Sequence, residues 1–144
     1  MPIDWTTVKH FKPADFRCRG LEAGGIFHDC GLNNPDPQLV YDLDAARDFV
    51  NQPLIINSAC RCAAHNAAVG GVEPSAHGPD PNDGYCKAVD IQCASDSLRF
   101  KLVNFFLARG YVRIEVSNLH VHVDRAQDFR PSPYFGVAWF GGNK

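Results

Sequence analysis

The chain has 144 residues, of which 45% are hydrophobic and 21% charged, so it is neither a disordered nor a collagen-like polymer. This length fits one domain over residues 1–144 that buries its own core, and we expect a monomer. The formal net charge of -2 gives no electrostatic reason to expect nucleic acid as a partner. No apolar run could span a bilayer, and the N-terminus lacks the apolar core of a signal peptide. We therefore expect synthesis in the cytoplasm without membrane insertion.

The first third of the chain predicts a wrap followed by a helix. Residues 1–35 are expected to form an irregular N-terminal wrap, because glycines recur between Gly20 and Gly31. The segment 35–52 predicts an amphipathic helix behind Asp36 as its N-cap. Its apolar residues recur at helical spacing: Leu39, Val40, Leu43, Ala46 and Phe49.

The middle of the chain predicts two strands and a second long helix. Residues 53–59 predict a buried strand, and 62–71 a short helix. Residues 87–93 predict a strand that points Asp90 away from the core, because its neighbours are apolar. The second long helix is expected over 95–111. Its cap is Ser95 or Ser97, its end is Gly110, and its apolar stripe is Leu98, Leu102, Phe105 and Phe106. The buried residues of the first strand are expected to be Leu54, Ile55 and Ile56.

The segment VRIEVSNLHVHVD predicts a β-hairpin with a two-residue turn at 117–118. In this register Glu115 faces His120, and Arg113 faces His122. The apolar face then holds Ile114, Val116, Leu119, Val121 and Val123. The polar face holds Arg113, Glu115, His120, His122 and Asp124. Together the elements predict an α+β fold in which a small antiparallel sheet packs with two long helices.

Two histidines and a carboxylate are candidate ligands of a catalytic zinc: His77, Asp90 and His122. Zinc accepts neutral imidazole and carboxylate oxygen, and three protein ligands leave a position for water, as hydrolysis requires. The apolar neighbours of Asp90 predict burial, and a buried carboxylate needs a metal or a partner. The alternatives are structural histidines and a solvated carboxylate. The rival ligands are Asp80 and Asp83, whose loop is otherwise expected to be solvated.

Three segments carry a family resemblance: SACRC, SAH...KAVD and HVD. They resemble the signature S-G-x-R-S, S-x-H-x-x-G-x-A-x-D and H-x-D of the zinc D-alanyl-D-alanine carboxypeptidase family of peptidoglycan peptidases. The run HNAAVGGVEPSAH is similar to the single-domain, phage-type branch. The resemblance covers roughly residues 11–124. It implies a Hedgehog/DD-peptidase-like fold, one Zn²⁺ per chain on His77, Asp90 and His122, and the peptidoglycan stem peptide as substrate.

Two features depart from this signature. The loop GPDPNDGYCKAV separates His77 from Asp90 by more residues than in relatives, and loops accept added length at small entropic cost. Better-known members also place an acidic residue three positions before the last ligand. This chain has Leu119 there, so the identity of the general base stays open.

Four further residues are expected to serve catalysis or substrate binding. The resemblance assigns Arg61 to a substrate carboxylate or carbonyl, which a guanidinium grips bidentately, unless it is a surface arginine. Ser75 is expected to hydrogen-bond near His77, unless it only forms a turn. His120 is expected near the metal, to stabilise an oxyanion or protonate the leaving amine. Glu115 is expected to act as the base or to orient His120, unless it forms a simple surface pair.

The remaining histidines are expected to be structural or incidental: His65, His10 and His28. The six cysteines allow up to three disulfides, but reduced, buried thiols are expected in a reducing cytosol. No C-x-x-C spacing is present, which disfavours a second, structural zinc.

These observations predict zinc-dependent hydrolysis of a peptide bond in bacterial peptidoglycan, by a D-Ala carboxypeptidase or an endolysin-like endopeptidase. Such an enzyme acts on the cell wall, and without a signal peptide a holin is the expected route of release. The alternative is a catalytically inactive relative that serves as a wall-binding or virion structural module, which Leu119 favours. A third possibility is a zinc amidase or other hydrolase that acts on a peptide outside the wall.

Overall fold

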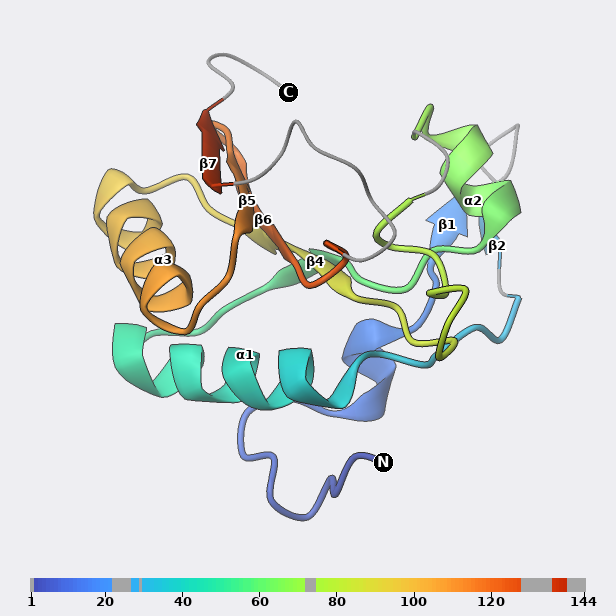
Figure 1. Cartoon of the computed structure of the whole chain (residues 1–144), viewed down its shortest axis with the longest axis horizontal. Helices are drawn as coiled ribbons and strands as arrows, with labels where there is room; N and C mark the ends of the chain where they lie inside the picture. The colour runs from blue at the N-terminus through green and yellow to red at the C-terminus, as the bar shows by residue number, and fades with distance from the viewer. Residues whose placement is uncertain (1, 22–26, 29, 72–74, 128–135, 140–144) are drawn as a thin grey trace.

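The computed structural model describes residues 2–21, 27–28, 30–71, 75–127 and 136–139 (Figure 1). Its elements follow in this order: η1 (Pro13–Phe16), β1 (Gly20–Leu21), β2 (Phe27–His28), α1 (Pro37–Val50), β3 (Ile56–Ser58), α2 (Ala63–Ala68), β4 (Ala88–Gln92), α3 (Asp96–Ala108), β5 (Arg113–Val116), β6 (His120–Asp124) and β7 (Gly136–Trp139). Within the described residues, the main sheet has the strand order β3-β4-β6-β5-β7. Its first four strands are antiparallel, and β7 runs parallel to β5. The predicted α+β fold is therefore confirmed, and β7 is an addition to it.

Both long helices begin and end on the signals that the sequence contains. In α1, the Asp36 carboxylate accepts a hydrogen bond from the Leu39 backbone N–H at 3.1 Å, and Pro37 occupies a first-turn position that needs no N–H donor. In α3, the Ser95 hydroxyl accepts from the Leu98 N–H at 3.2 Å. Gly110 follows with a φ of +86°, which lets the chain leave the helix. The cap of α3 is therefore Ser95 and not Ser97.

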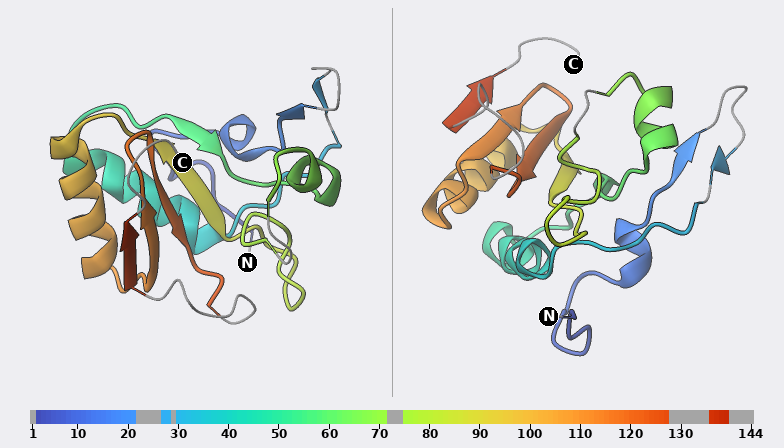
Figure 2. Two further views of the ribbon diagram at one scale, coloured as in Figure 1. Left: turned by 90° about the horizontal axis from the view of Figure 1, so that it is seen from above. Right: turned by 45° about the vertical axis from the view of Figure 1, so that its right-hand side comes forward.

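Helices α1 and α3 pack on the same face of the sheet and enclose the core (Figures 1 and 2). The predicted stripes are buried in it, with one exception in α1: Phe49 is 57% exposed and packs its ring against Phe105. Ile55 is also 55% exposed, contrary to prediction, because Leu54 and Ile56 take the inward face of an extended segment. The segment thus alternates between buried and exposed side chains, whereas the sequence predicts that all three are buried.

The N-terminal wrap is less irregular than predicted. It contains η1 and the two-stranded β1–β2 sheet, whose connecting residues 22–26 lie outside the described part of the chain. Phe16 in η1 is fully buried, and the rings of Trp5 and Phe11 both lie 5.9 Å from it. The wrap is thus anchored in the main core by an aromatic cluster.

The predicted hairpin exists as β5 and β6, but its predicted register is wrong by two residues. Glu115 pairs with His122, and Arg113 pairs with Asp124. The Ser117 N–H donates to the His120 carbonyl at 3.0 Å, so the turn falls one residue later than predicted. Because a shift of two residues preserves the alternation, the polar and apolar faces are as predicted. Leu119 is the exception: it lies in the turn and is 54% exposed.

The register is set by hydrogen bonds that the hairpin pattern does not reveal. The Ser117 hydroxyl accepts from the backbone N–H groups of Leu119 and His120 at 3.3 and 3.2 Å. The buried Arg99 of α3 donates to the carbonyls of Ser117 and Asn118, both at 2.9 Å. The turn is therefore stabilised by the Ser117 hydroxyl and by the Arg99 guanidinium, and it does not fall at 117–118 as predicted.

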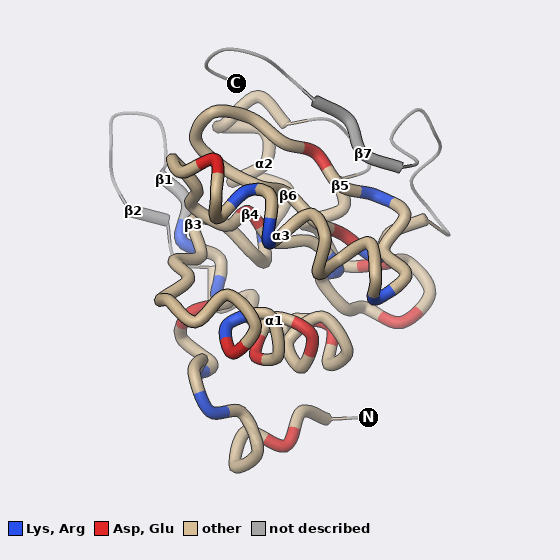
Figure 3. The backbone as a smooth tube through the Cα atoms, turned by 90° about the vertical axis from the view of Figure 1, so that its left-hand side faces the viewer, with Lys and Arg blue, Asp and Glu red and all other residues tan. Residues whose placement is uncertain are grey.

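The surface carries both signs of charge, as the small net charge indicates. Figure 3 shows acidic and basic residues interspersed along α1. Among the described residues, no helix combines the length and the apolar composition that crossing a membrane requires.

Candidate metal centre

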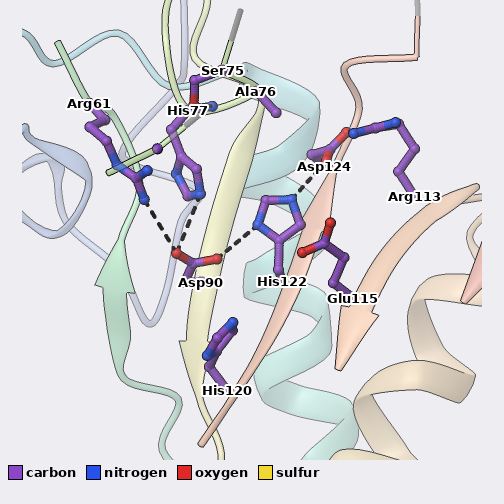
Figure 4. Close-up of a pocket in the computed structure, with 11 residues that line it drawn as sticks. Arg61, Ser75, Ala76, His77, Asp90, Arg113, Glu115, His120, His122 and Asp124 are labelled. Carbon is purple, nitrogen blue, oxygen red and sulfur yellow. Dashed lines mark hydrogen bonds and ion pairs between the residues drawn. The ribbon is translucent and has the colours of Figure 1, made fainter. Parts of the chain in front are cut away.

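A pocket of about 220 Å³ lies on the sheet face away from the two long helices (Figure 4). It brings together every residue to which the sequence assigns a site role: Arg61, Ser75, His77, Asp90, Glu115, His120 and His122. The rest of its lining is Gly71, Ala76, Arg113 and Asp124. Residues from β4, β5, β6 and two loops thus converge on one cavity.

Three of these side chains form a group that could hold a metal ion: His77, Asp90 and His122. One donor atom from each lies within 4.8 Å of the others. The Asp90 carboxylate is in the middle, with Oδ1 at 2.8 Å from His122 Nδ1 and Oδ2 at 3.3 Å from His77 Nε2. Two imidazoles and a carboxylate that converge in this way fit the donor set of a catalytic zinc site. The inserted loop between His77 and Asp90 does not prevent their convergence.

The main sheet fixes two of the three candidate ligands. Asp90 in β4 and His122 in β6 are direct partners across the antiparallel pair. Both face away from the core, because their neighbours Val89, Val121 and Val123 are fully buried on the other side. Alternation therefore places both donors on the pocket side.

His77 belongs to a loop, and hydrogen bonds to a neighbouring segment hold it in place. Its Nδ1 lies 2.7 Å from the Ala59 carbonyl, so Nδ1–H donates there and Nε2 faces Asp90. The Arg61 N–H donates to the His77 carbonyl at 3.0 Å. The His77 N–H donates to the Ser75 hydroxyl at 3.1 Å, which is the contact expected for Ser75. The segment 59–61 thus positions this loop ligand.

His122 is oriented by a second carboxylate, that of Asp124. His122 Nε2 lies 2.7 Å from Asp124 Oδ2, which leaves Nδ1 for the side of Asp90 and His77. Asp124 is held in turn by Arg113 Nε at 2.6 Å and by the Ala126 N–H at 2.9 Å. A carboxylate behind a ligand histidine fixes its tautomer and strengthens it as a donor.

Sequence reasoning assigned no role to Asp124 or Arg113. The signal was present, however, because Asp124 is the last residue of the H-x-D segment and shares the polar face with His122.

Charge is concentrated around His122. Burial alone lowers the pKa of His122, but the carboxylates of Asp124 and Asp90 raise it to about 10. Burial raises the pKa of Asp90, yet its contacts with His77 and His122 bring that pKa well below the usual range. The pKa of Asp124 is lowered in the same way, against the effect of burial, by His122 and Arg113. Both carboxylates are therefore ionised at neutral pH, and they favour a cation between the imidazoles.

Arg61 lies at the edge of the candidate ligand group. Its Nη2 is 3.6 Å from Asp90 Oδ2 and donates to the Ser58 hydroxyl at 3.3 Å, while Nη1 donates to Asn66 Oδ1 at 3.1 Å. Burial lowers its pKa, and the negative charge of Asp90 opposes that effect. Gly71 makes this geometry possible, because a Cβ at that position would lie 2.0 Å from Asn66 Oδ1. Arg61 is thus a positioned side chain and not a mobile surface arginine.

Glu115 and His120 both line the pocket, but they are not the cross-strand neighbours that the sequence predicted. Glu115 lies opposite His122, whereas His120 lies opposite Gln92 in β4. His120 Nδ1 contacts the Ser117 hydroxyl at 3.1 Å. Among the described residues Glu115 forms no ion pair, and Arg113 binds Asp124 instead. The alternative of a simple surface pair with Arg113 or His120 is therefore not seen in the described part of the chain.

The rival candidates lie outside the pocket. Lys87 Nζ is 2.8 Å from both Asp80 and Asp83, so these carboxylates form ion pairs within the inserted loop. Asp80 is buried, contrary to the prediction of a solvated loop, because Lys87 neutralises it. His10 pairs with Asp48 at 2.7 Å, and His65 contacts Cys18. The side chain of His28 lies outside the described part of the structure.

A known protein family matches the part of the chain that contains this pocket. A family model described as Peptidase M15 matches residues 9–124, a segment that contains every residue lining the pocket. No curated protein matches the chain. Peptidases of this family are zinc-dependent, and the donor set of the pocket suits that metal. The chain belongs to the peptidase M15 family, that of the zinc D-alanyl-D-alanine carboxypeptidase-like enzymes.

Proposed function

We propose that the protein is a zinc metallopeptidase that hydrolyses a peptide bond in the stem peptides of bacterial peptidoglycan, as a D-Ala carboxypeptidase or as an endopeptidase. The convergence of His77, Asp90 and His122 in a pocket that also contains Arg61 and Glu115 carries this proposal. When bound, zinc polarises a carbonyl group and lowers the pKa of water. Peptidoglycan as substrate makes the cell wall the site of action.

Arg61 is the substrate-binding residue of this proposal. Its guanidinium lines the same cavity as the candidate metal ligands and is held on two sides by Ser58 and Asn66. A positioned guanidinium binds a carboxylate through two parallel hydrogen bonds. The terminal carboxylate of a stem peptide, or a backbone carbonyl next to the scissile bond, fits such a donor. Ser75 lines the same cavity and keeps the His77 loop in place.

Glu115 is the general base in this proposal. The acidic residue that better-known relatives carry three positions before the last ligand is replaced by Leu119, which lies exposed in the turn. Glu115 reaches the site from the neighbouring strand instead, because it stands directly opposite His122. Side chains directly opposite in an antiparallel pair have Cβ atoms about 5 Å apart. His120, on the same side of β6, is the candidate to stabilise the oxyanion or to protonate the leaving amine.

Digestion of purified peptidoglycan tests this function. We expect cleavage that a chelator abolishes and added zinc restores, and mass spectrometry of defined muropeptides identifies the bond. His122→Ala is expected to be inactive, whereas His10→Ala, which removes a histidine paired with Asp48 outside the pocket, keeps the parental rate. A zinc-loaded, folded protein that leaves peptidoglycan intact contradicts the proposal. That result favours the inactive, wall-binding relative, for which the exchange to Leu119 is the supporting observation. Cleavage of other peptides alone favours a hydrolase that acts outside the wall.

A further inference from the structure

A second group of potential metal ligands lies outside the pocket. The sulfur atoms of Cys18, Cys30 and Cys62 all lie within 4.8 Å of one another. His65 Nδ1 lies 3.4 Å from Cys18 Sγ. We propose that these four residues bind a second zinc ion in a structural Cys₃His site. The proposal does not depend on peptidase activity, and it raises the zinc expected per chain from one to two.

The three sulfur atoms form the group, His65 lies beside it at Cys18, and the spacings are close to those around one tetrahedral ion. Zinc–sulfur bonds of about 2.3 Å and zinc–nitrogen bonds of about 2.0 Å at tetrahedral angles place sulfur roughly 3.5 Å from nitrogen and roughly 3.8 Å from another sulfur. The contact of 3.4 Å between Cys18 and His65 matches the first value. The sulfur atoms lie within 4.8 Å of one another. This upper limit exceeds the sulfur–sulfur distance around zinc by about 1 Å, a difference that rotation of the side chains can close.

The local folds explain why these four residues meet. Cys18 and Cys30 lie just outside the paired strands β1 and β2, and the Cys18 N–H donates to the Leu32 carbonyl at 2.8 Å, which joins the two segments beyond the strands. Cys62 is the N-cap of α2 and His65 lies three residues later, so both occupy one turn of the helix. In Figure 1, β1 and β2 lie beside α2. Cys18 and Cys30 thus come from the N-terminal hairpin segment, and Cys62 and His65 form a C-x-x-H pair at α2. This arrangement contains no C-x-x-C spacing, so the sequence did not indicate it.

Hydrogen bonds to the sulfur atoms support the assignment. The Cys62 N–H donates to Cys18 Sγ at 3.4 Å, and the His65 N–H donates to Cys62 Sγ at 3.4 Å. Backbone donors aimed at sulfur favour the thiolate, which is the form that binds zinc. The prediction of buried cysteines holds for Cys18, but Cys62 is half-buried and Cys30 is exposed. A reduced, exposed cysteine beside two others is better explained as a ligand than as a core residue.

The position of this cluster indicates its role. Cys62 directly follows Arg61, and the same segment supplies the carbonyl of Ala59 that orients His77. A zinc ion on the cluster would tie this segment to the N-terminal hairpin. The second zinc therefore stabilises the part of the chain that positions the substrate-binding arginine and a pocket ligand.

Zinc content of protein purified under reducing conditions tests the proposal. We expect two zinc ions in the wild type, one in His122→Ala, one in Cys62→Ser and in Cys30→Ser, and none in the His122→Ala/Cys62→Ser double variant. Cys93→Ala removes a buried cysteine outside the cluster and should keep two. If the pocket alone fails to bind zinc, the wild type contains one zinc ion. Cys62→Ser and Cys30→Ser then remove that ion, and His122→Ala does not. One ion that His122→Ala removes completely overturns the inference about the cluster.

Cobalt provides a readout that needs no unstable variant. Co²⁺ bound to thiolates gives strong charge-transfer absorption in the near ultraviolet, whereas a site of imidazole and carboxylate does not. Reduced wild-type protein loaded with Co²⁺ should show this band, and Cys30→Ser, at an exposed position, should weaken it without unfolding the protein. Its absence from the wild type, or a disulfide among Cys18, Cys30 and Cys62 in zinc-supplemented, reduced protein, overturns the proposal.

Discussion

Glu115, on β5, is the residue to which we assign the role of general base, because the chain has no acid three positions before His122. Its strand partner is His122, and it lines the same pocket as the three candidate ligands. Leu119, the residue at the position of the acid in better-known relatives, is too exposed and too apolar for that role. In the proposed function the general base therefore lies on β5 and not on β6.

Glu115→Gln should therefore keep its pocket zinc and lose about a hundredfold or more in kcat, because the amide is isosteric but accepts no proton at neutral pH. Steady-state cleavage of muropeptides and elemental analysis measure the two quantities. Asp48→Asn, a similar change at a carboxylate on α1 that pairs with Lys9 and His10, is the control and should cleave at the parental rate. An unchanged kcat in Glu115→Gln transfers the role to His120, and His120→Ala then tests that residue.

Arg61→Lys should lower kcat/KM by about tenfold or more although the charge is conserved, because an ammonium group cannot form two parallel hydrogen bonds with a carboxylate. Metal content should stay the same, since Arg61 is not a candidate ligand. Arg109→Lys, at a half-exposed arginine paired with Asp42, serves as the matched control. Equal kcat/KM values for Arg61→Lys and the parent mean that the guanidinium does not bind the substrate.

At the scale of elements, the predictable features are those that depend on local periodicity. Asp36 could be identified as a cap, and the cap of α3 could be narrowed to Ser95 or Ser97, because a short acceptor stood before an apolar helical pattern. The faces of β4, β5 and β6 could be assigned because alternation depends on the parity of position and not on register. The register itself could not be predicted, since a buried arginine 18 residues away in sequence holds Ser117. The C-terminal strand β7 escaped prediction because no such periodicity marked it.

Arg99 therefore has a testable role in stability. Its guanidinium is 4% exposed and donates to the carbonyls of Cys93, Ser117 and Asn118. Arg99→Met leaves these carbonyls without their donor and should lower the free energy of unfolding by roughly 3 kcal/mol in urea titrations. Lys101→Met, on the exposed side of the same helix, should change it by less than about 0.5 kcal/mol. A similar loss in both variants would show that the effect comes from the helix and not from the turn.

At the scale of the molecule, the two sides of the sheet have separate tasks. The core side is filled by α1 and α3, while the opposite side carries the pocket (Figure 4). The candidate ligands could be predicted from the sequence because each lies in a short recognisable segment. The hydrogen bonds behind these ligands could not be predicted, because they form only in the folded chain. Ala59 contacts His77, and Arg113 contacts Asp124, the residue that orients His122. One domain over residues 1–144 stays a prediction, which a core shared by both long helices and four strands supports.

This separation means that loss of the pocket metal should weaken the fold without abolishing it. His77 comes from a loop, whereas Asp90 and His122 come from the sheet, so an ion bound to all three holds the loop against the sheet. Free zinc at about one hundred times its Kd contributes roughly 2.7 kcal/mol to stability. For a domain of this size that corresponds to an increase in Tm of about 5–11 °C over the chelated protein.

Calorimetry of zinc-loaded and chelated protein measures this increase. In His122→Ala the increase should be smaller than in the parent, because the pocket no longer retains zinc while the cysteine cluster still does. His10→Ala, a change at a histidine outside both sites, should show the full increase. Equal Tm values with and without zinc in the parent protein would mean that no ion links the His77 loop to the sheet. An increase in His122→Ala as large as that of the parent would assign all the stabilisation to Cys18, Cys30, Cys62 and His65.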